Sequence, residues 1–183
     1  MNPSPNLFLI GPMGAGKSSI GRRLARHFGM PCIDLDAAIE EHTGVSVATI
    51  FEIEGEQGFR RRESDLLAEL SARRGVVLAT GGGAVLAAAN RCMLRERGFV
   101  VWLATGVDQQ MLRLERDRKR PLLDTPDRRG RLEVLARERD PLYRDLADLA
   151  VESGGESCEA SAVRIAGMVE RHWQRTPLAP ESA

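Results

Sequence analysis

The sequence predicts an α/β fold, with a parallel five-stranded sheet flanked by helices on both faces. Short apolar runs alternate along the chain with stretches of helical periodicity, which is typical of a parallel sheet. A glycine-rich loop at 11–18 joins the first apolar run to a helical stretch, as anion-binding loops do. The 183 residues, 43% of them hydrophobic, fit a single domain with a sizeable core. We therefore expect one domain over 1–183, with its core at about 6–173.

The first half of the chain supplies three of the strands. Ile20, Leu24 and Phe28 recur every fourth residue, which predicts an amphipathic helix that Gly29 ends. Ser46 is placed to cap a later helix. In order, we expect a strand at 6–10, a helix at 17–28, a strand at 31–35, helices at 36–43, 46–54 and 56–73, and a strand at 75–79.

The second half alternates in the same way, with one interruption. The interruption at 116–130 is rich in arginine and has little periodicity, so we expect an exposed, mobile lid there. The tail at 174–183 is predicted to be disordered. The elements expected are a helix at 86–97, a strand at 99–103, a helix at about 108–117, a helix at 131–139 that Pro141 kinks or restarts, a strand at 149–152 and a helix at 158–173.

Composition argues against several kinds of partner. Lysine and arginine together number 26, as do aspartate and glutamate, so a net charge of zero gives no electrostatic reason to expect nucleic acid or membrane. The first residues, MNPSPN, lack the features of a secretion signal, and no apolar segment is long enough to cross a bilayer. Cys32, Cys92 and Cys158 show no metal-binding spacing. We expect a reduced, cytoplasmic protein.

The loop from Gly11 to Ser18 matches G-x-x-x-x-G-K-[ST], a pattern that binds nucleotide phosphates. Its glycines let the backbone wrap a phosphate group, Lys17 supplies a point charge, and the Ser18 hydroxyl suits Mg²⁺. The pattern predicts a nucleoside triphosphate as ligand, but it occurs in switches, motors and kinases alike. No asparagine is followed by lysine, so the base-reading N-K-x-D motif of a guanine switch is absent. A motor would normally be larger.

Two carboxylates follow the second predicted strand. Asp34 ends that strand and could bind Mg²⁺ directly or through water, and Asp36 lies two residues further on. In an extended segment both side chains point to the same side, so one could serve the metal and the other the hydroxyl that attacks phosphate. The alternative is that both residues merely cap the following helix.

Arginines gather at two further places. Residues 60–62 are all arginine, and Arg139 and Arg144 flank Pro141. Taken alone, each is explained by a solvent-exposed charged face. If the acceptor of a phosphoryl group carries a carboxylate, however, forked guanidinium groups are the expected clamp.

Six segments, in order and with matching spacing, resemble the shikimate kinases. They are GPMGAGKSSIGRRLA at the loop, DLD at 34–36, GEQGFRRRE at 55–63, TGGGAV at 80–85, RPLL at 120–123 and RDPLYR at 139–144. The resemblance implies a P-loop fold like that of nucleoside monophosphate kinases, with a mobile lid. It also implies transfer of a phosphoryl group from ATP to the 3-hydroxyl of shikimate, in the biosynthesis of chorismate and aromatic amino acids.

The resemblance further implies roles for individual residues. The nucleotide phosphates would be held by Gly14, Ala15, Gly16, Lys17, Ser18 and Ser19, with Mg²⁺ at Ser18 and Asp34. Shikimate would be held by Asp36, Arg60, Gly82 and Arg139, with Asp36 as or near the base. Arg120, from the lid, would join Lys17 in stabilising the transferred phosphoryl group, and Arg113 would lie near the adenine.

Two other kinds of function remain open from the sequence. Another small-molecule kinase of the same architecture, for gluconate or a nucleoside monophosphate, would share the loop. A non-catalytic ATP-binding protein would be expected to have lost Lys17, Asp34 or Asp36, and all three are present. We expect ATP and shikimate as the ligands, no nucleic-acid or membrane partner, and a monomer.

Overall fold

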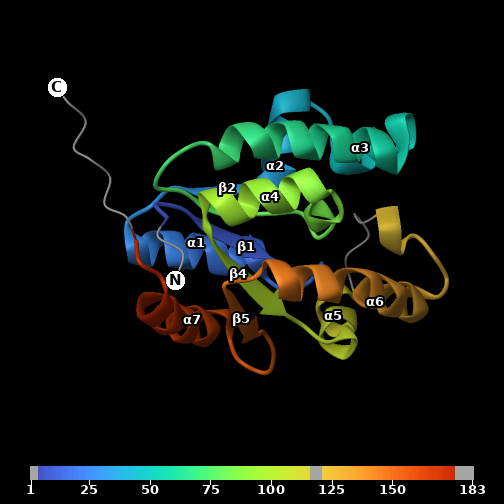
Figure 1. Ribbon diagram of the computed structural model, residues 1–183. Coiled ribbons are helices and arrows are strands. Elements are labelled where there is room, and N and C mark those ends of the chain that lie inside the picture. The colour runs from blue at the N-terminus through green and yellow to red at the C-terminus, as the bar shows by residue number, and fades with distance from the viewer. Residues whose placement is uncertain (1–3, 116–120, 176–183) are drawn as a thin grey trace.

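Five parallel strands form one sheet at the centre of the molecule (Figure 1). The computed structural model describes residues 4–115 and 121–175. The strand order is β2-β3-β1-β4-β5, so β1 lies between β3 and β4 in the middle of the sheet. The predicted parallel five-stranded sheet is thus confirmed. The strands are β1 (Leu7–Ile10), β2 (Cys32–Asp34), β3 (Val77–Ala79), β4 (Phe99–Ala104) and β5 (Leu149–Glu152).

Among the described residues, seven α-helices flank this sheet. Gly29 ends the first of them in the left-handed conformation that the sequence pattern predicted. No helix in this part of the chain is long and apolar enough to span a membrane. The helices are α1 (Lys17–Phe28), α2 (Leu35–Thr43), α3 (Val47–Ser71), α4 (Ala88–Arg97), α5 (Val107–Leu114), α6 (Arg128–Leu146) and α7 (Cys158–His172), with short 3₁₀ turns η1 (Ala84–Leu86) and η2 (Pro121–Leu123).

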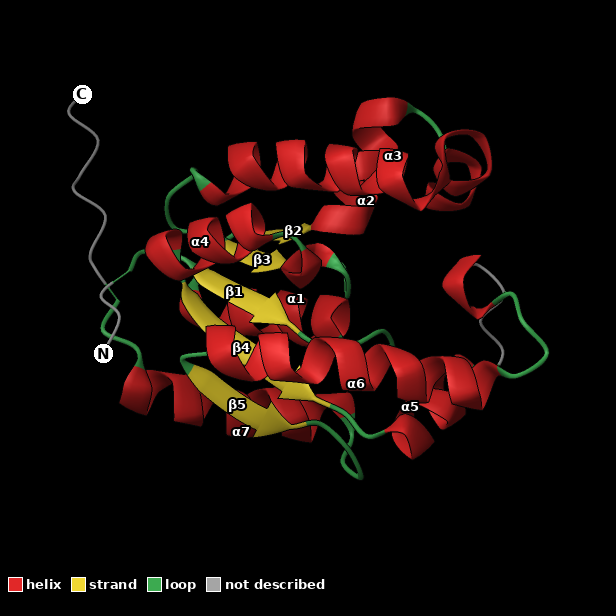
Figure 2. Cartoon of the chain, turned by 45° about the vertical axis from the view of Figure 1, so that its right-hand side comes forward, coloured by secondary structure: helices red, strands yellow, loops and turns green. Residues whose placement is uncertain are grey.

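Successive side chains of each strand pack on opposite faces of the sheet. Leu7 and Leu9 of β1 belong to the apolar layer under α1 and α7, whereas Phe8 and Ile10 belong to the layer under α2, α3, α4 and α6. Figure 2 shows the strands enclosed between these two groups of helices. Both faces of the strands are therefore buried, as a parallel sheet requires.

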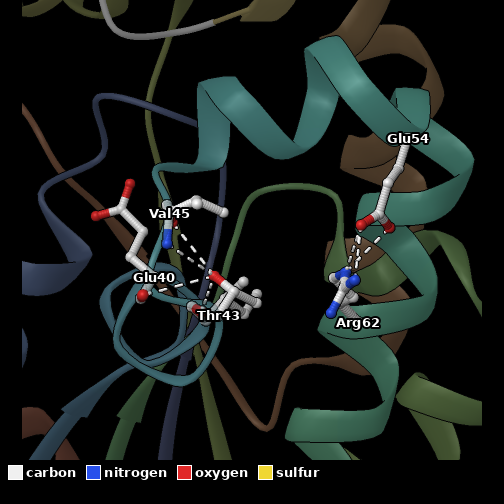
Figure 3. Close-up of polar contacts among 6 residues, drawn as sticks. Glu40, Thr43, Val45, Glu54 and Arg62 are labelled. Atoms are coloured by element: carbon white, nitrogen blue, oxygen red, sulfur yellow. Dashed lines mark hydrogen bonds and ion pairs between the residues drawn. The ribbon is translucent and has the colours of Figure 1, made fainter.

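Helix α3 is kinked at Gly55, where φ is 69° and ψ is 179°. The sequence predicted two separate helices here, and the kink marks the boundary between them. Arg62 bridges the kink by donating three hydrogen bonds of 2.6 to 3.1 Å to the carboxylate of Glu54 (Figure 3). At the other end of this first part of α3, the Glu40 carboxylate accepts from the Val47 amide at 2.8 Å. These contacts fix the segment between Val47 and Glu54 at both ends.

Three boundaries differ from the prediction. Pro141 lies inside one helix, α6, which runs from Arg128 to Leu146, so the expected restart of the helix at this proline is wrong. The segment 116–130, expected to be an irregular lid, contains η2 and the start of α6, and 116–120 lie outside the described residues, so the lid itself stays a prediction. Arg175, placed in the predicted tail, forms an isolated bridge with Ser4, while 176–183 lie outside the described residues.

Candidate active site

The loop that follows β1 is built on glycines in left-handed conformations. Gly11, Gly14 and Gly16 have φ values of 137°, 76° and 89°, which residues with a side chain rarely adopt. Lys17 folds back over the loop, and its Nζ donates to the carbonyls of Gly11 and Pro12 at 2.7 and 2.8 Å. The N-terminus of α1 and an ammonium group therefore meet at one place, an arrangement that binds anions.

Two side chains from distant parts of the chain hold this loop. Ser153, directly after β5, donates to the Ala15 carbonyl at 2.9 Å and is only 3% exposed. Arg113 of α5 donates to the Gly14 carbonyl at 3.0 Å and to the Ser153 hydroxyl at 3.2 Å. The shape of the loop thus depends on α5 and the end of β5 as well as on its own glycines.

A hollow beside the loop, here called the loop hollow, collects most of the residues predicted to hold a nucleotide and a metal ion. Ala15 differs from its neighbours, because the residue is fully buried in the core and does not line the hollow. The hollow is lined by Met13, Gly14, Gly16, Lys17, Ser18, Ser19, Asp34, Asp36, Thr80, Gly82, Arg113 and Leu114.

Asp34 ends β2 in an extended conformation, whereas Asp36 lies in the first turn of α2, so the two residues do not share one extended segment. The expectation that strand geometry turns both carboxylates to one side is wrong, because Leu35 already begins the helix. Asp34 is the N-cap, and its Oδ1 accepts from the Ala37 amide at 3.2 Å. Asp36 follows in the first turn. Both nevertheless line the loop hollow, so capping by Asp34 and a place in the site occur together.

A second hollow, here called the arginine hollow, adjoins the first. Met13, Asp36 and Gly82 line both hollows, so a group bound in one lies next to a group bound in the other. The arginine hollow brings together the four residues that were predicted to hold an acceptor. It is lined by Met13, Asp36, Val47, Phe51, Phe59, Arg60, Glu63, Gly81, Gly82, Gly83, Pro121, Leu122 and Arg139.

The turn of Gly81, Gly82 and Gly83 after β3 forms one wall of the arginine hollow. None of the three has a positive φ, so conformational freedom does not explain them. A Cβ on Gly81 would collide with the Glu63 carboxylate, and a Cβ on Gly83 would collide with the Arg60 guanidinium. Close approach of these two side chains is therefore the reason for the outer glycines.

Arg60 is held by two carboxylates of its own helix. Its guanidinium donates to Glu63 at 2.7 Å and to Glu56 at 3.1 Å. Glu63 is fully buried, and its Oε1 has no hydrogen-bond partner among the described residues. Burial raises the pKa of the Glu63 carboxyl, although Arg60 opposes the shift. Burial lowers the pKa of Arg60, but the two carboxylates outweigh it and the net pKa is raised, so Arg60 stays charged.

Arg139 and Tyr143 lie one turn apart on α6. Arg139 is 4% exposed, and within the described part of the chain its Nε has no hydrogen-bond partner. Burial lowers the pKa of its guanidinium. Tyr143 is fully buried and donates its hydroxyl to the Gly82 carbonyl. A buried guanidinium with an unused N–H indicates a place for an anion, because leaving such a group unpaired is costly.

Sequence reasoning assigned no role to three residues of this region. Glu63 and Tyr143 stand inside the segments GEQGFRRRE and RDPLYR, and Ser153 directly follows the fifth strand, at the edge where parallel sheets bind ligands. Each therefore had a signal in the sequence. Arg120, which was predicted to act from the lid, lies outside the described residues, so its place stays a prediction.

Comparison with known proteins points to one family. A family model described as shikimate kinase matches residues 13–170. A shikimate kinase of Stenotrophomonas maltophilia is 48% identical over 180 residues, which cover 98% of this chain and 100% of the relative. A shikimate kinase of Methylococcus capsulatus is 52% identical over 170 residues, which cover 93% of this chain and 95% of the relative.

Solved structures give the same result. A shikimate kinase from Acinetobacter baumannii, solved in complex with shikimate, superposes with a TM-score of 0.89 at 45% identity and covers 92% of this chain and 94% of its own. A gluconokinase from Sinorhizobium meliloti covers 93% of this chain and 98% of its own with a TM-score of 0.56, but at 20% identity it shows a shared fold only. The family model and these relatives match nearly the whole chain, and the protein therefore belongs to the shikimate kinase family.

Proposed function

We propose that this enzyme transfers the terminal phosphoryl group of ATP to the 3-hydroxyl of shikimate, giving shikimate 3-phosphate and ADP for aromatic amino-acid biosynthesis. The observation that carries the proposal is that the loop hollow and the arginine hollow share Met13, Asp36 and Gly82. A nucleotide in one hollow and an acidic acceptor in the other would therefore lie side by side, with the reacting atoms next to Asp36. Membership of the family supports the same reaction.

On the donor side, the backbone amides of residues 14–19 receive the phosphates at the start of α1. Lys17 supplies a positive charge that stabilises the phosphate oxygens as charge develops on them. Arg113 touches the loop at Gly14 and borders the same hollow, which supports a contact with the adenosine part of the nucleotide.

Mg²⁺ fits the loop hollow as well. Ser18 offers a hydroxyl oxygen and Asp34 a carboxylate oxygen, and hard oxygen donors of this kind are what Mg²⁺ prefers. Asp34 uses its Oδ1 on the Ala37 amide and has a second oxygen for the ion or its water. When bound, the ion neutralises charge on the nucleotide phosphates.

On the acceptor side, Arg60 and Arg139 hold the shikimate carboxylate between two guanidinium groups. Gly82 offers its backbone amide to the acceptor, and Asp36 takes the proton of the 3-hydroxyl as its oxygen attacks phosphorus. The unused N–H of buried Arg139 favours an anionic acceptor, because a carboxylate oxygen would supply the charge-assisted hydrogen bond that this N–H lacks.

The lid completes this proposal. We assign to Arg120 the stabilisation of the transferred phosphoryl group, in the manner of an arginine finger. Support comes from the neighbouring residues Pro121 and Leu122, which line the arginine hollow and so bring the chain after Arg120 next to the acceptor.

We further propose that the enzyme acts as a cytoplasmic monomer without a nucleic-acid or membrane partner. Cys32, Cys92 and Cys158 are free thiols, which suits a reducing compartment. Light scattering on the purified protein tests the oligomeric state, and a mass of about one chain of 20.1 kDa is expected.

An ADP-release assay with three acceptors tests the reaction. Purified enzyme with MgATP is given shikimate, gluconate or AMP in turn, and the product is identified by phosphorus NMR. We expect only shikimate to raise ADP release well above the background, with phosphate on the 3-oxygen. Equal or faster turnover with gluconate or AMP would overturn the assignment. ATP binding without turnover of any acceptor would favour a non-catalytic protein.

A further inference from the structure

We propose that Tyr143 is a positioning residue for the acceptor. Its hydroxyl fixes the glycine turn at 81–83 against α6, so that the Gly82 amide and the Arg139 guanidinium are held in one geometry. This inference rests on the proposed function, because it takes shikimate as the ligand of the arginine hollow. Nothing in the phosphoryl transfer itself requires Tyr143, which lines neither hollow.

Every carbonyl of the glycine turn accepts a hydrogen bond, and the middle one depends on Tyr143. The Gly81 carbonyl accepts from the Ala84 amide at 3.2 Å, and the Gly83 carbonyl accepts from the Leu86 amide at 3.0 Å. The Gly82 carbonyl accepts from the Tyr143 hydroxyl. Without that donor the Gly82 carbonyl would lose its hydrogen bond, and the peptide between Gly82 and Gly83 would lose one of its restraints.

The hydroxyl is a permanent donor because of its surroundings. Tyr143 is fully buried, and burial raises the pKa of its hydroxyl far above the ordinary value, against the opposing charges of Arg139 and Arg60. The group therefore keeps its proton at every working pH. The ring itself is held by stacking on Trp102 of β4, with ring centroids 5.9 Å apart.

Helix geometry links this contact to the carboxylate clamp. Residues four positions apart lie on the same face of a helix, so Arg139 and Tyr143 project from neighbouring turns of α6. Arg139 reaches the acceptor directly, whereas Tyr143 reaches the turn that carries Gly82. Movement of α6 would therefore shift both groups proposed to touch the acceptor. Gly82 also borders the loop hollow, but the segment 13–19 that forms most of that hollow is held by Ser153 and Arg113 instead.

The variant Tyr143→Phe tests this inference, because it removes only the hydroxyl and keeps the ring. We expect the KM for shikimate to rise about tenfold with kcat within about twofold, since a buried carbonyl loses its donor and binding is weakened equally in the ground and transition states. The KM for ATP should change by less than about twofold. A variant that was merely less stable would not separate the two substrates in this way.

Trp102→Phe is the matched control. It alters the other side of the same aromatic stack and leaves the hydroxyl in place, so the KM for shikimate should stay within about twofold of the wild type. An unchanged shikimate KM in Tyr143→Phe, or an equal rise in both KM values, would overturn the inference. Turnover of shikimate by the wild-type enzyme is measured in the same experiment. If the wild type phosphorylates shikimate, an unchanged KM in Tyr143→Phe contradicts only the role of Tyr143 and not the proposed function.

A second measurement, on the wild-type protein, tests the same inference if Tyr143→Phe does not fold. The chain has one tyrosine, so growth with 3-fluorotyrosine labels Tyr143 alone. We expect its single fluorine resonance to shift on addition of shikimate and to move much less on addition of MgADP. A resonance that shikimate leaves in place would show that the hydroxyl does not sense the acceptor, and would overturn the inference.

Discussion

The loop hollow and the arginine hollow are neighbours that are built in opposite ways. Most of the loop hollow comes from one short segment, residues 13–19, in which glycine conformations and a helix N-terminus create the anion site. The arginine hollow gathers side chains from α2, α3, η2 and α6 and the backbone of the glycine turn. The difference teaches that phosphate binding can be encoded locally, whereas recognition of the acceptor depends on how distant elements pack.

The two hollows also differ in the groups that supply their charge. The loop hollow relies on backbone amides and the partly shielded Lys17, which no single side-chain replacement removes entirely. The arginine hollow relies on Arg60, oriented by Glu63, and on buried Arg139. Substitutions in the arginine hollow should therefore raise the KM for shikimate more than the KM for ATP. The following variants measure this difference between the two substrates.

The largest effect is expected at Asp36, where the hollows meet. Asp36→Asn should lower kcat by about 10²–10⁴-fold, the usual contribution of a general base, while nucleotide affinity is retained. Rapid-quench turnover and calorimetric titration with ADP measure the two quantities. Asp65→Asn, at an exposed position of α3, is the control and should behave as the wild type. Near-normal turnover of Asp36→Asn would rule out the role as base.

A large but more selective effect is expected at Arg139. Arg139→Lys keeps the charge but loses the guanidinium fork, so the KM for shikimate should rise roughly 100-fold while the KM for ATP stays near its original value. Initial rates over both substrates give this split. Arg137→Lys, two positions earlier and exposed on the same helix, serves as control. An equal rise in the KM values for shikimate and ATP would contradict the assignment of one substrate to each hollow.

A smaller effect is expected from crowding the glycine turn. In Gly81→Ala the new Cβ would collide with the Glu63 carboxylate, which orients Arg60. The free energy of unfolding should fall by about 1–3 kcal/mol, and the KM for shikimate should rise about tenfold. Urea unfolding and initial rates measure both. Gly167→Ala in α7, where a Cβ meets only ordinary contacts, should not lower the stability.

The smallest effect is expected on the donor side, at Ser153. Ser153→Ala removes the hydrogen bond to the Ala15 carbonyl, so the KM for ATP should rise by about three- to tenfold with the KM for shikimate unchanged. Ser157→Ala is the matched control. It removes the N-cap of α7 and should cost about 1 kcal/mol of stability without changing either KM. An ATP KM unmoved in Ser153→Ala would show that the loop holds its shape alone.

Much of the fold was predictable because its signals are local. The alternation of apolar runs with helical periodicity predicted the five parallel strands, and Gly29 and Ser46 marked helix boundaries that the structure confirms. At Pro141 the sequence left a kink or a restart of the helix open, and the structure excludes the restart, because the proline lies inside the single helix α6.

In the candidate site, too, the residues with local sequence signals were predicted and those that depend on distant partners or on burial were not. Gly16, Lys17 and Ser18 were found from spacing alone, because a phosphate loop is one continuous piece of backbone, whereas Gly14 was added by the resemblance to the shikimate kinases. The shared placement of Asp34 and Asp36 was predicted for the wrong reason, since the start of α2 and not strand geometry brings them together. Glu63, Tyr143 and Ser153 received no role, because their partners lie far away in the sequence or depend on burial.

Short segments of the sequence are enough to predict the order of strands and helices, the anion-binding loop and the residues that resemble the shikimate kinases. The folded chain was needed to see that Arg60, Arg139 and Asp36 line one hollow and that this hollow adjoins the loop hollow at Gly82. It also decided which charges are paired and which are buried. The physical reason is that spacing along the chain specifies backbone conformation, whereas packing across the sheet sets the distances, burial and electrostatics between side chains that the chain keeps far apart.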